Sequence, residues 1–283
     1  MFRRRSSSKR MRQPAELAPF PMVALRVLQL AAEDDPDRAA GPTELIDVVR
    51  TDAAISARIL RLANSSLYGF RHRIDTLQAA GMALGTEKLI EIVLASAVSL
   101  YHAPRGHLQE RQSVLLWRRS LCTALAAQEL APARGVDPAR AFFAGLFLSL
   151  GLLRFHQVYP PRILARVRTL HAEGLDGPMA TRRVFGLDHV QEGARLVRDW
   201  GLPSWIAASM EDARAARPSD LVGACLRDAD VSACALLLED GELGEEDYWT
   251  IDATTVAARV EDPEEEALRA FLRERTRTFD QAA

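Results

Sequence analysis

The most constraining feature of the sequence is an almost wholly apolar segment, AFFAGLFLSLGLL, at residues 141–153. It holds a single polar side chain, Ser149, and two glycines. Such a segment suits a membrane anchor, a core helix or the inner wall of an active site. Arg140 and Arg154 limit it to thirteen residues, whereas a membrane-spanning helix needs roughly 18 to 20 apolar residues. The length therefore argues against a membrane span.

The chain as a whole predicts an all-α fold. Leu, Ala, Arg and Glu recur at spacings of three and four residues, whereas valine and isoleucine seldom alternate with polar residues as a half-buried strand requires. Proline, glycine and capping residues divide the chain into segments. We expect helices over residues 22–32, 42–49, 53–66, 76–85, 88–101, 108–131, 139–159, 161–173, 178–185, 188–200, 203–215, 219–239 and 263–279.

Three aspartates stand where helix N-caps are expected. Asp52 and Asp75 each precede a segment of helical periodicity, and Asp137 is followed by Pro138, which suits the first turn of a helix. The apolar segment is therefore predicted to belong to one continuous helix of about 139–159.

Charge is unevenly distributed along the chain. The formal net charge is −2, residues 1–12 carry six basic groups, and residues 239–283 carry fourteen acids against five arginines. The remainder is close to neutral, so the body offers no broad electrostatic footprint for nucleic acid. We expect no DNA binding.

The three cysteines, Cys122, Cys225 and Cys234, fall at no metal-binding or redox spacing. The basic N-terminus lacks the apolar run of a secretory signal. Together these observations predict reduced thiols in a cytoplasmic protein.

Several ordered blocks resemble a known family. They are the proline-flanked entry AELAPFPMVALRVLQLAAEDDPD, VVRTDAAISARILRLANSSLYGF (48–70), IDTLQAAGMALGTEKLIEIVL (74–94), LWRRSLCTALAAQELA, AFFAGLFLSLGLL and FGLDHVQEGARLVRDWGLP. In their order and spacing they are similar to the HDOD family, a regulatory offshoot of the HD-domain metal-dependent phosphohydrolases. The resemblance covers roughly residues 16–215. It implies a multi-helix HD-like bundle over these residues. From charge and patterning we expect a disordered basic arm at 1–15 and an acidic helical extension at 216–283.

The resemblance also implies where HD enzymes would hold their metals. The first histidine ligand would occupy the position of Arg119, and the His-Asp pair the positions of Leu148 and Ser149. A guanidinium has no lone pair and is always cationic, and leucine cannot act as a ligand. His189 matches a histidine position of the family, and Asp230 can match the last aspartate; Met210-Glu211-Asp212 stands where a histidine pair is expected.

These replacements predict a protein without a catalytic metal, a cofactor or hydrolase activity. His189, beside a helix N-terminus, is expected to be a structural histidine. The sequence also lacks the G-x-S-x-G, P-loop and G-x-G-x-x-G motifs. His102 and His107 flank a segment that we expect to be a solvated loop.

A second candidate site lies at the end of the helix predicted over 53–66. Arg58, Arg61 and Asn64 fall on one side of it, away from the apolar positions. The simple interpretation is a helix terminus with two surface arginines. The sharper hypothesis is a partner-binding edge made by Arg58, Arg61, Asn64, Ser65 and Tyr68.

The leading functional hypothesis is a non-catalytic signalling scaffold that acts through contacts with a signalling protein. The basic arm and the acidic C-terminal region are further candidate contacts. The alternative is a sensor that binds a nucleotide or another phosphorylated effector, such as a cyclic dinucleotide, in the vestigial pocket of Arg119, Leu148, Ser149, His189 and Asp230, since a guanidinium there can hold phosphate. Partner, pathway and oligomeric state stay open.

Overall fold

The computed structural model describes residues 20–31, 41–65, 68–215, 217–244 and 253–282, and the predicted basic arm lies outside these ranges. All regular structure within them is helical, which confirms the all-α prediction. The α-helices are α1 (Met22–Ala31), α2 (Pro42–Val49), α3 (Ala53–Ala63), α4 (Leu77–Tyr101), α5 (Glu110–Leu130), α6 (Pro138–Phe147), α7 (Leu150–Val158), α8 (Pro161–Ala172), α9 (Gly177–Phe185), α10 (His189–Asp199), α11 (Ser204–Ala213), α12 (Leu221–Glu239), α13 (Ala253–Val260) and α14 (Glu266–Ala282).

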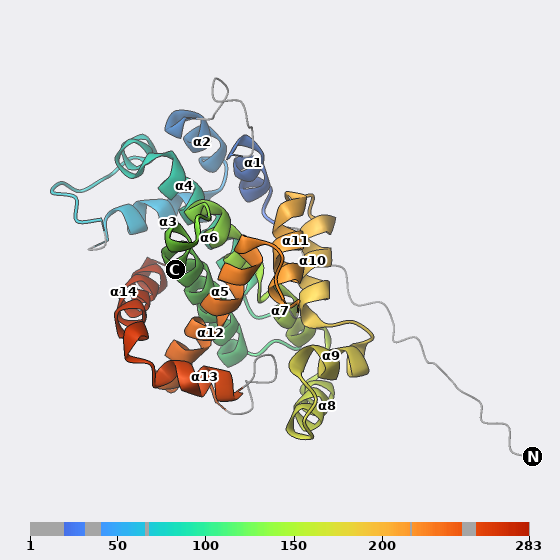
Figure 1. Ribbon diagram of the computed structural model, residues 1–283. Helices are drawn as coiled ribbons and strands as arrows, with labels where there is room; N and C mark the ends of the chain where they lie inside the picture. Colours follow the sequence, from blue (N-terminus) through green and yellow to red (C-terminus); the bar gives the residue numbers. More distant parts are fainter. Residues whose placement is uncertain (1–19, 32–40, 66–67, 216, 245–252, 283) are drawn as a thin grey trace, which may run out of the picture.

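The helices are arranged around α5, which packs against both α6 and α12 (Figure 1). α2 and α3 lie against α4, and α7 and α11 lie against α10. α8 and α9 form a pair at one end of the molecule, while α14 covers α5, α12 and α3. One large apolar cluster joins residues from nearly all of these helices.

The start of α4 departs in detail from the sequence prediction. Asp75 is not the N-cap; the Thr76 hydroxyl accepts a hydrogen bond from the Ala79 amide at 3.1 Å, while Asp75 accepts one from Arg73. Gly85, with φ 78° and ψ 170°, kinks the helix where two helices were predicted. Only glycine adopts this φ at little cost, so Gly85 separates the two predicted halves as expected.

The apolar segment forms two helices, and the prediction of a single helix over 139–159 is wrong. α6 ends at Phe147 and α7 begins at Leu150. The Leu148 amide bonds the Gly145 carbonyl at 3.2 Å, a tight turn, and Ser149 has φ −85° and ψ 1°, outside the helical region. The chain therefore changes direction at Leu148-Ser149.

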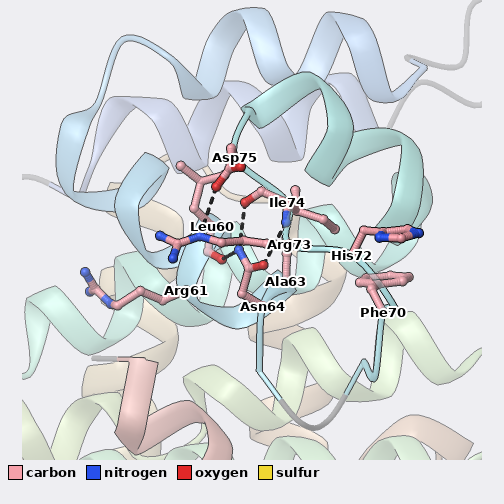
Figure 2. A pocket seen from close by; sticks show the side chains of 9 residues that line it. All are labelled: Leu60, Arg61, Ala63, Asn64, Phe70, His72, Arg73, Ile74 and Asp75. Carbon is pink, nitrogen blue, oxygen red and sulfur yellow. Dashed lines mark hydrogen bonds and ion pairs between the residues drawn. The ribbon is translucent and has the colours of Figure 1, made fainter.

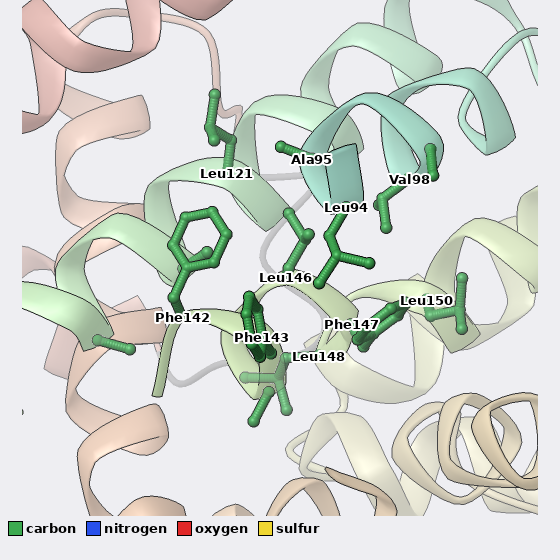
Figure 3. Packing of buried hydrophobic residues seen from close by; sticks show 14 of the residues in the cluster. Leu94, Ala95, Val98, Leu121, Phe142, Phe143, Leu146, Phe147, Leu148 and Leu150 are labelled. Carbon is green, nitrogen blue, oxygen red and sulfur yellow. The ribbon is translucent and has the colours of Figure 1, made fainter. Parts of the chain in front are cut away.

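The region Pro138–Val158 is long and apolar enough to cross a membrane, so its length does not exclude a span, contrary to the prediction from residues 141–153. However, 89% of its most apolar window is buried inside the fold. Leu148 packs near Phe143, Phe147 and Leu150 in this core (Figure 3). Burial by the other helices, and not the length of the segment, supports its assignment as core.

The C-terminal helices pack on the rest of the structure. Leu226 and Ala229 of α12 and Leu272 and Phe279 of α14 are buried in the main apolar cluster. Ion pairs flank them: Arg118 of α5 bonds Asp280 at 2.8 Å and also pairs with Glu242. The sequence predicted α12 and α14 but not the short helix α13.

His102 does not lie in a solvated loop. It is the C-cap of α4, it is 1% exposed, and its Nδ1 atom lies 2.8 Å from the Val98 carbonyl oxygen. Burial lowers the pKa of His102 to about 4, although the bond to Val98 opposes the shift. The ring is therefore neutral at neutral pH.

We predict that His102 makes the protein less stable in mild acid. The unfolded chain takes up a proton on His102 near pH 6.5 and the folded chain only near pH 4. The free energy of unfolding therefore falls by up to about 3 kcal/mol as the pH drops through this window. His102→Asn keeps an amide donor for Val98 and cannot titrate, so its free energy of unfolding should fall less. Urea denaturation at several pH values measures both, and parallel curves would contradict the prediction.

Candidate functional site

Two of the positions that resemble HD metal ligands, Arg119 and Asp230, meet in a buried ion cluster. Asp230 of α12 accepts hydrogen bonds from Arg119 of α5, with Nε to Oδ1 at 3.0 Å and Nη2 to Oδ2 at 2.9 Å. Arg214, the C-cap of α11, donates to Oδ2 at 2.5 Å. The hydroxyl of Thr123 donates to Oδ1 at 3.3 Å. Two arginines and a hydroxyl, from α5 and the end of α11, therefore converge on one carboxylate of α12.

Because Arg119 and Asp230 are buried, the ionised state of each is stabilised by the charge of the other. The side chains of Arg119 and Asp230 are 4% and 1% exposed. Burial alone would raise the pKa of Asp230, but Arg119 and Arg214 lower it to about 2. Burial likewise opposes the charge of Arg119, and Asp230 outweighs this and raises the pKa of the guanidinium. The pair is thus fully ionised at neutral pH.

His189, at the first position of α10, lies beside this cluster. It is 1% exposed, and burial lowers its pKa well below the usual value. The charges of Arg214 and Arg119 lower the pKa further, while Asp230 opposes them. His189 is therefore a neutral imidazole.

Leu148 and Ser149 occupy the turn between α6 and α7 and are each 2% exposed. The Leu148 side chain packs in the apolar core (Figure 3). The Ser149 hydroxyl has no hydrogen-bond partner among the described residues. Leucine has no lone pair to offer a metal, and the Ser149 hydroxyl is a single weak donor.

Two glycines bring this turn close to the neighbouring helices. A Cβ at Gly145 would lie 2.8 Å from the Ala124 Cα of α5. A Cβ at Gly151 would lie only 1.7 Å from the His189 carbonyl oxygen of α10. Side chains cannot be accommodated at these distances without a backbone shift, so both positions require glycine.

The site does not fit a divalent metal. A metal ion needs several converging lone pairs to replace its hydration shell, and Asp230 directs its oxygens at two cationic guanidinium groups. Within the described ranges, no group of three or more His, Cys, Asp or Glu side chains is placed to hold an ion. The two arginines already neutralise this carboxylate.

The second candidate site, at the end of α3, is more structural than the sequence suggested. The Asn64 side chain donates to the carbonyl oxygens of Leu60 and Ile74 and accepts from the Ile74 amide, at 2.7 to 2.8 Å. Ser65 donates to the Leu62 carbonyl at 2.6 Å. Both polar side chains thus serve the backbone.

The remaining residues of this edge differ in exposure. Tyr68 is half-buried, and burial, together with Glu91, raises its pKa to about 12. Arg58 reaches the Ser96 carbonyl, 3.4 Å away, and Arg61 is exposed. A cavity of about 550 Å³ lies beside Arg61 and Asn64 (Figure 2).

Sequence reasoning missed several residues of these sites. Arg214 completes the ion cluster, yet no local pattern distinguishes it from other surface arginines. Phe70, His72 and Arg73 line the cavity. They lie just beyond Tyr68, the last residue of the predicted partner-binding edge. The run from Ala53 to Ile74 contains no acid, and this pattern could have indicated a basic surface that extends to Arg73.

The fold and the site define an all-α domain built around a buried arginine–aspartate cluster. The profile of the HDOD domain family matches residues 17–215. This region is well over half of the chain, so the chain belongs to the HDOD domain family. A comparison with curated proteins finds no match.

Solved structures share this fold. A Geobacter sulfurreducens HDOD domain protein of unknown function has a TM-score of 0.68 and 24% identity, covering 92% of this chain and 93% of its own. A proposed phosphohydrolase of Shewanella amazonensis SB2B has a TM-score of 0.66 and 22% identity, covering 94% and 95%. A proposed signal transduction protein of Marinobacter aquaeolei VT8 has a TM-score of 0.65 and 22% identity, and the match covers 94% of this chain but 59% of that one. At these identities the likeness shows the fold alone.

We predict that Gly151→Ala destabilises the protein by about 1–3 kcal/mol or more, because α7 and α10 must separate to admit the methyl group. Gly41→Ala is the control, since a Cβ there meets no atom within 4 Å. Urea denaturation compares the two variants. Equal midpoints would show that the α7–α10 contact is not tight.

We also predict that Asp230→Asn lowers the free energy of unfolding by about 3–5 kcal/mol, because it leaves the buried Arg119 charge uncompensated. Glu211→Gln provides the matched control. It disrupts the Arg198–Glu211 pair, whose side chains are 48% and 40% exposed, and should cost less than about 1 kcal/mol. Similar losses in both variants would argue against a dominant role for the buried cluster.

Proposed function

We propose that this chain is a non-catalytic signal-transduction domain that acts through contacts with a protein partner. The observation that carries the proposal is the binding of Asp230 by Arg119 and Arg214. This cluster stands where the resemblance to HD enzymes implies a metal centre. An internal ion pair in that place supports a binding role over hydrolysis.

Physical chemistry supports the loss of catalysis. Metal-dependent hydrolysis requires an ion that activates water and polarises the phosphoryl oxygens. The two guanidinium groups repel a cation, and Leu148 offers no lone pair. Arg119 and Asp230 are also almost completely buried, so a substrate phosphate does not reach them without rearrangement.

A role in signal transduction is supported by a solved structure that shares this fold. A Marinobacter aquaeolei VT8 structure of this fold is named as a proposed signal transduction protein. The cavity beside Arg61 and Asn64 provides a surface for a partner. A domain without catalytic activity passes a signal on only by binding another protein. The chemistry of the binding surface therefore determines which partner receives the signal.

Hydrolase assays test the non-catalytic part of the proposal. Purified protein is incubated with Mn²⁺, Mg²⁺, Zn²⁺ or, under anaerobic conditions, Fe²⁺, and hydrolysis of bis(p-nitrophenyl) phosphate is followed. We expect no turnover above that of the metal alone and no stoichiometric metal by elemental analysis after dialysis. Metal-dependent turnover that Asp230→Asn abolishes, in a variant shown to be folded, would overturn the proposal.

One observation favours the second candidate function, a sensor for a nucleotide or another phosphorylated effector. Nε of Arg214 is buried and has no hydrogen-bond partner among the described residues. The candidate ranks second because the Arg119 guanidinium, which would hold phosphate, already binds Asp230. Thermal unfolding in the presence of cyclic dinucleotides and guanosine tetraphosphate tests it: a rise in Tm that Arg214→Met removes would support the sensor, and no shift would exclude it.

A further inference from the structure

The last helix, α14, lies on the outside of the bundle and covers parts of α5, α12 and α3 (Figure 1). It begins at Glu266, beyond residue 215, where the match to the family profile ends. Two of its apolar side chains reach the main core: Leu272 is fully buried and Phe279 is 8% exposed. They are seven residues apart, so they lie two turns apart on one face of the helix.

Ion pairs attach α14 to its neighbours at the same spacing. Arg273 pairs with Glu239 and with Asp240 at the end of α12, at 2.8 Å in each case. Asp280, seven residues further along, accepts hydrogen bonds from Nε and Nη2 of Arg118 on α5, at 3.0 and 2.8 Å. These side chains are between 26% and 38% exposed, so solvent and salt screen the pairs.

The contact between α14 and the rest of the fold is polar and incompletely filled. The Thr276 Oγ1 atom lies 3.3 Å from the Sγ atom of Cys122 on α5, and both side chains are buried. A cavity of about 330 Å³ lies between α14, α5 and α12, and both residues line it. An element with few buried apolar contacts and partly solvated polar contacts is among the first to open locally. We therefore expect α14 to open before the helices of the core.

On the side of α3, the nearest buried carboxylate is already compensated within the domain. Burial raises the pKa of Tyr68 to about 12, Glu91 adds to this shift, and Arg275 of α14 opposes it. Glu91 is 6% exposed and accepts hydrogen bonds from Lys88 and from Gln128 of α5. The carboxylate of Glu91 therefore does not depend on α14 for its charge partner.

We propose that α14 is a displaceable strap over a helix-binding face of α5, α12 and α3. An amphipathic helix of the protein partner replaces it when that helix repeats the α14 pattern, namely an apolar residue followed by arginine and, seven residues later, an apolar residue followed by a carboxylate. The apolar residues then fill the sites of Leu272 and Phe279. Amphipathic helices bind grooves through anchors at such spacings. The inference rests on the proposed function and adds its regulation, because the free chain covers its own binding face.

Cys122 reports the opening of α14 in the full chain. It is 1% exposed beneath Thr276, whereas Cys225 bonds the Ala127 carbonyl in the main core. We expect N-ethylmaleimide to label Cys122 faster than Cys225 in the folded protein, and the difference to grow as salt screens the ion pairs of α14. Mass spectrometry of proteolytic peptides measures both rates. Equal rates for the two thiols at every salt concentration would overturn the proposal.

Matched arginine variants separate the strap from a general effect of charge. Arg273→Gln removes both pairs to α12 and should speed the labelling of Cys122 about two- to fivefold, with Cys225 unchanged. Arg277→Gln removes the same charge from an exposed position of α14 that forms no ion pair with the described residues, and should leave both rates unchanged. Equal acceleration in the two variants would show an effect of net charge only and would overturn the proposal. Circular dichroism confirms that each variant is folded.

A labelled synthetic peptide of residues 266–282 tests the covered face directly. The chain's own α14 competes with it at high effective concentration, so Arg273→Gln in the chain should bind the peptide about two- to fivefold more tightly than the unmodified chain. Glu239→Gln combined with Asp240→Asn removes the same pairs from α12. This change weakens α14 and the peptide alike and should give no gain in affinity. Equal binding of a peptide with the same residues in scrambled order would overturn the proposal.

The outcomes distinguish this inference from the proposed function. If Arg273→Gln neither speeds the labelling of Cys122 nor strengthens peptide binding, α14 is a fixed part of the fold and the inference is overturned. The non-catalytic role then still stands or falls with the hydrolase assay. Metal-dependent hydrolysis would overturn the proposed function whatever α14 does.

Discussion

The structure depends on a carboxylate that has almost no contact with solvent. A buried carboxylate remains ionised only where fixed positive charge and hydrogen bonds replace its hydration. For Asp230 this replacement comes from Arg119 on α5 and from Arg214 at the end of α11. Three helices are therefore joined by a single buried anion, and the buried charges of Arg119 and Asp230 stabilise one another.

Close apolar packing surrounds this ion cluster. Gly145 and Gly151 allow α6 and α7 to approach α5 and α10 closely, and Leu148 adds its side chain to the core. The cavity near the end of α3 lies outside this compact centre and is rimmed by exposed arginines. Rigidity at the centre and accessible charge at the edge suit a domain that presents a fixed surface.

Helical periodicity predicted most helices of the fold, because their apolar faces follow directly from the order of residues. It failed at Leu148-Ser149, where the sequence has no proline and the flanking Gly145 and Gly151 lie against α5 and α10. It also failed at Asp75 and Thr76, since both residues are competent N-caps and only the path of the chain selects between them. Capping at Asp52 was confirmed, because the carboxylate accepts from the Ala54 and Ile55 amides.

The candidate sites were predicted only in part. The family resemblance identified Arg119 and Asp230 as related positions, although they lie 111 residues apart. Arg214 carries no such signal, because its role depends on where α11 ends in space. Asn64 was noticed as a polar helix terminus, but its partner Ile74 lies ten residues further along, in a segment without regular structure.

Asp230 lies outside the region that the family profile matches. The family profile ends at residue 215, yet the anion that compensates Arg119 and Arg214 sits beyond that point, on α12. The region matched by the family profile therefore contains Arg119 and Arg214 but not Asp230, the carboxylate that compensates their charge. A cut between α11 and α12 would leave Arg119 and Arg214 on one fragment and their counterion Asp230 on the other, so we expect a fragment that ends at residue 215 to keep a buried positive charge without compensation.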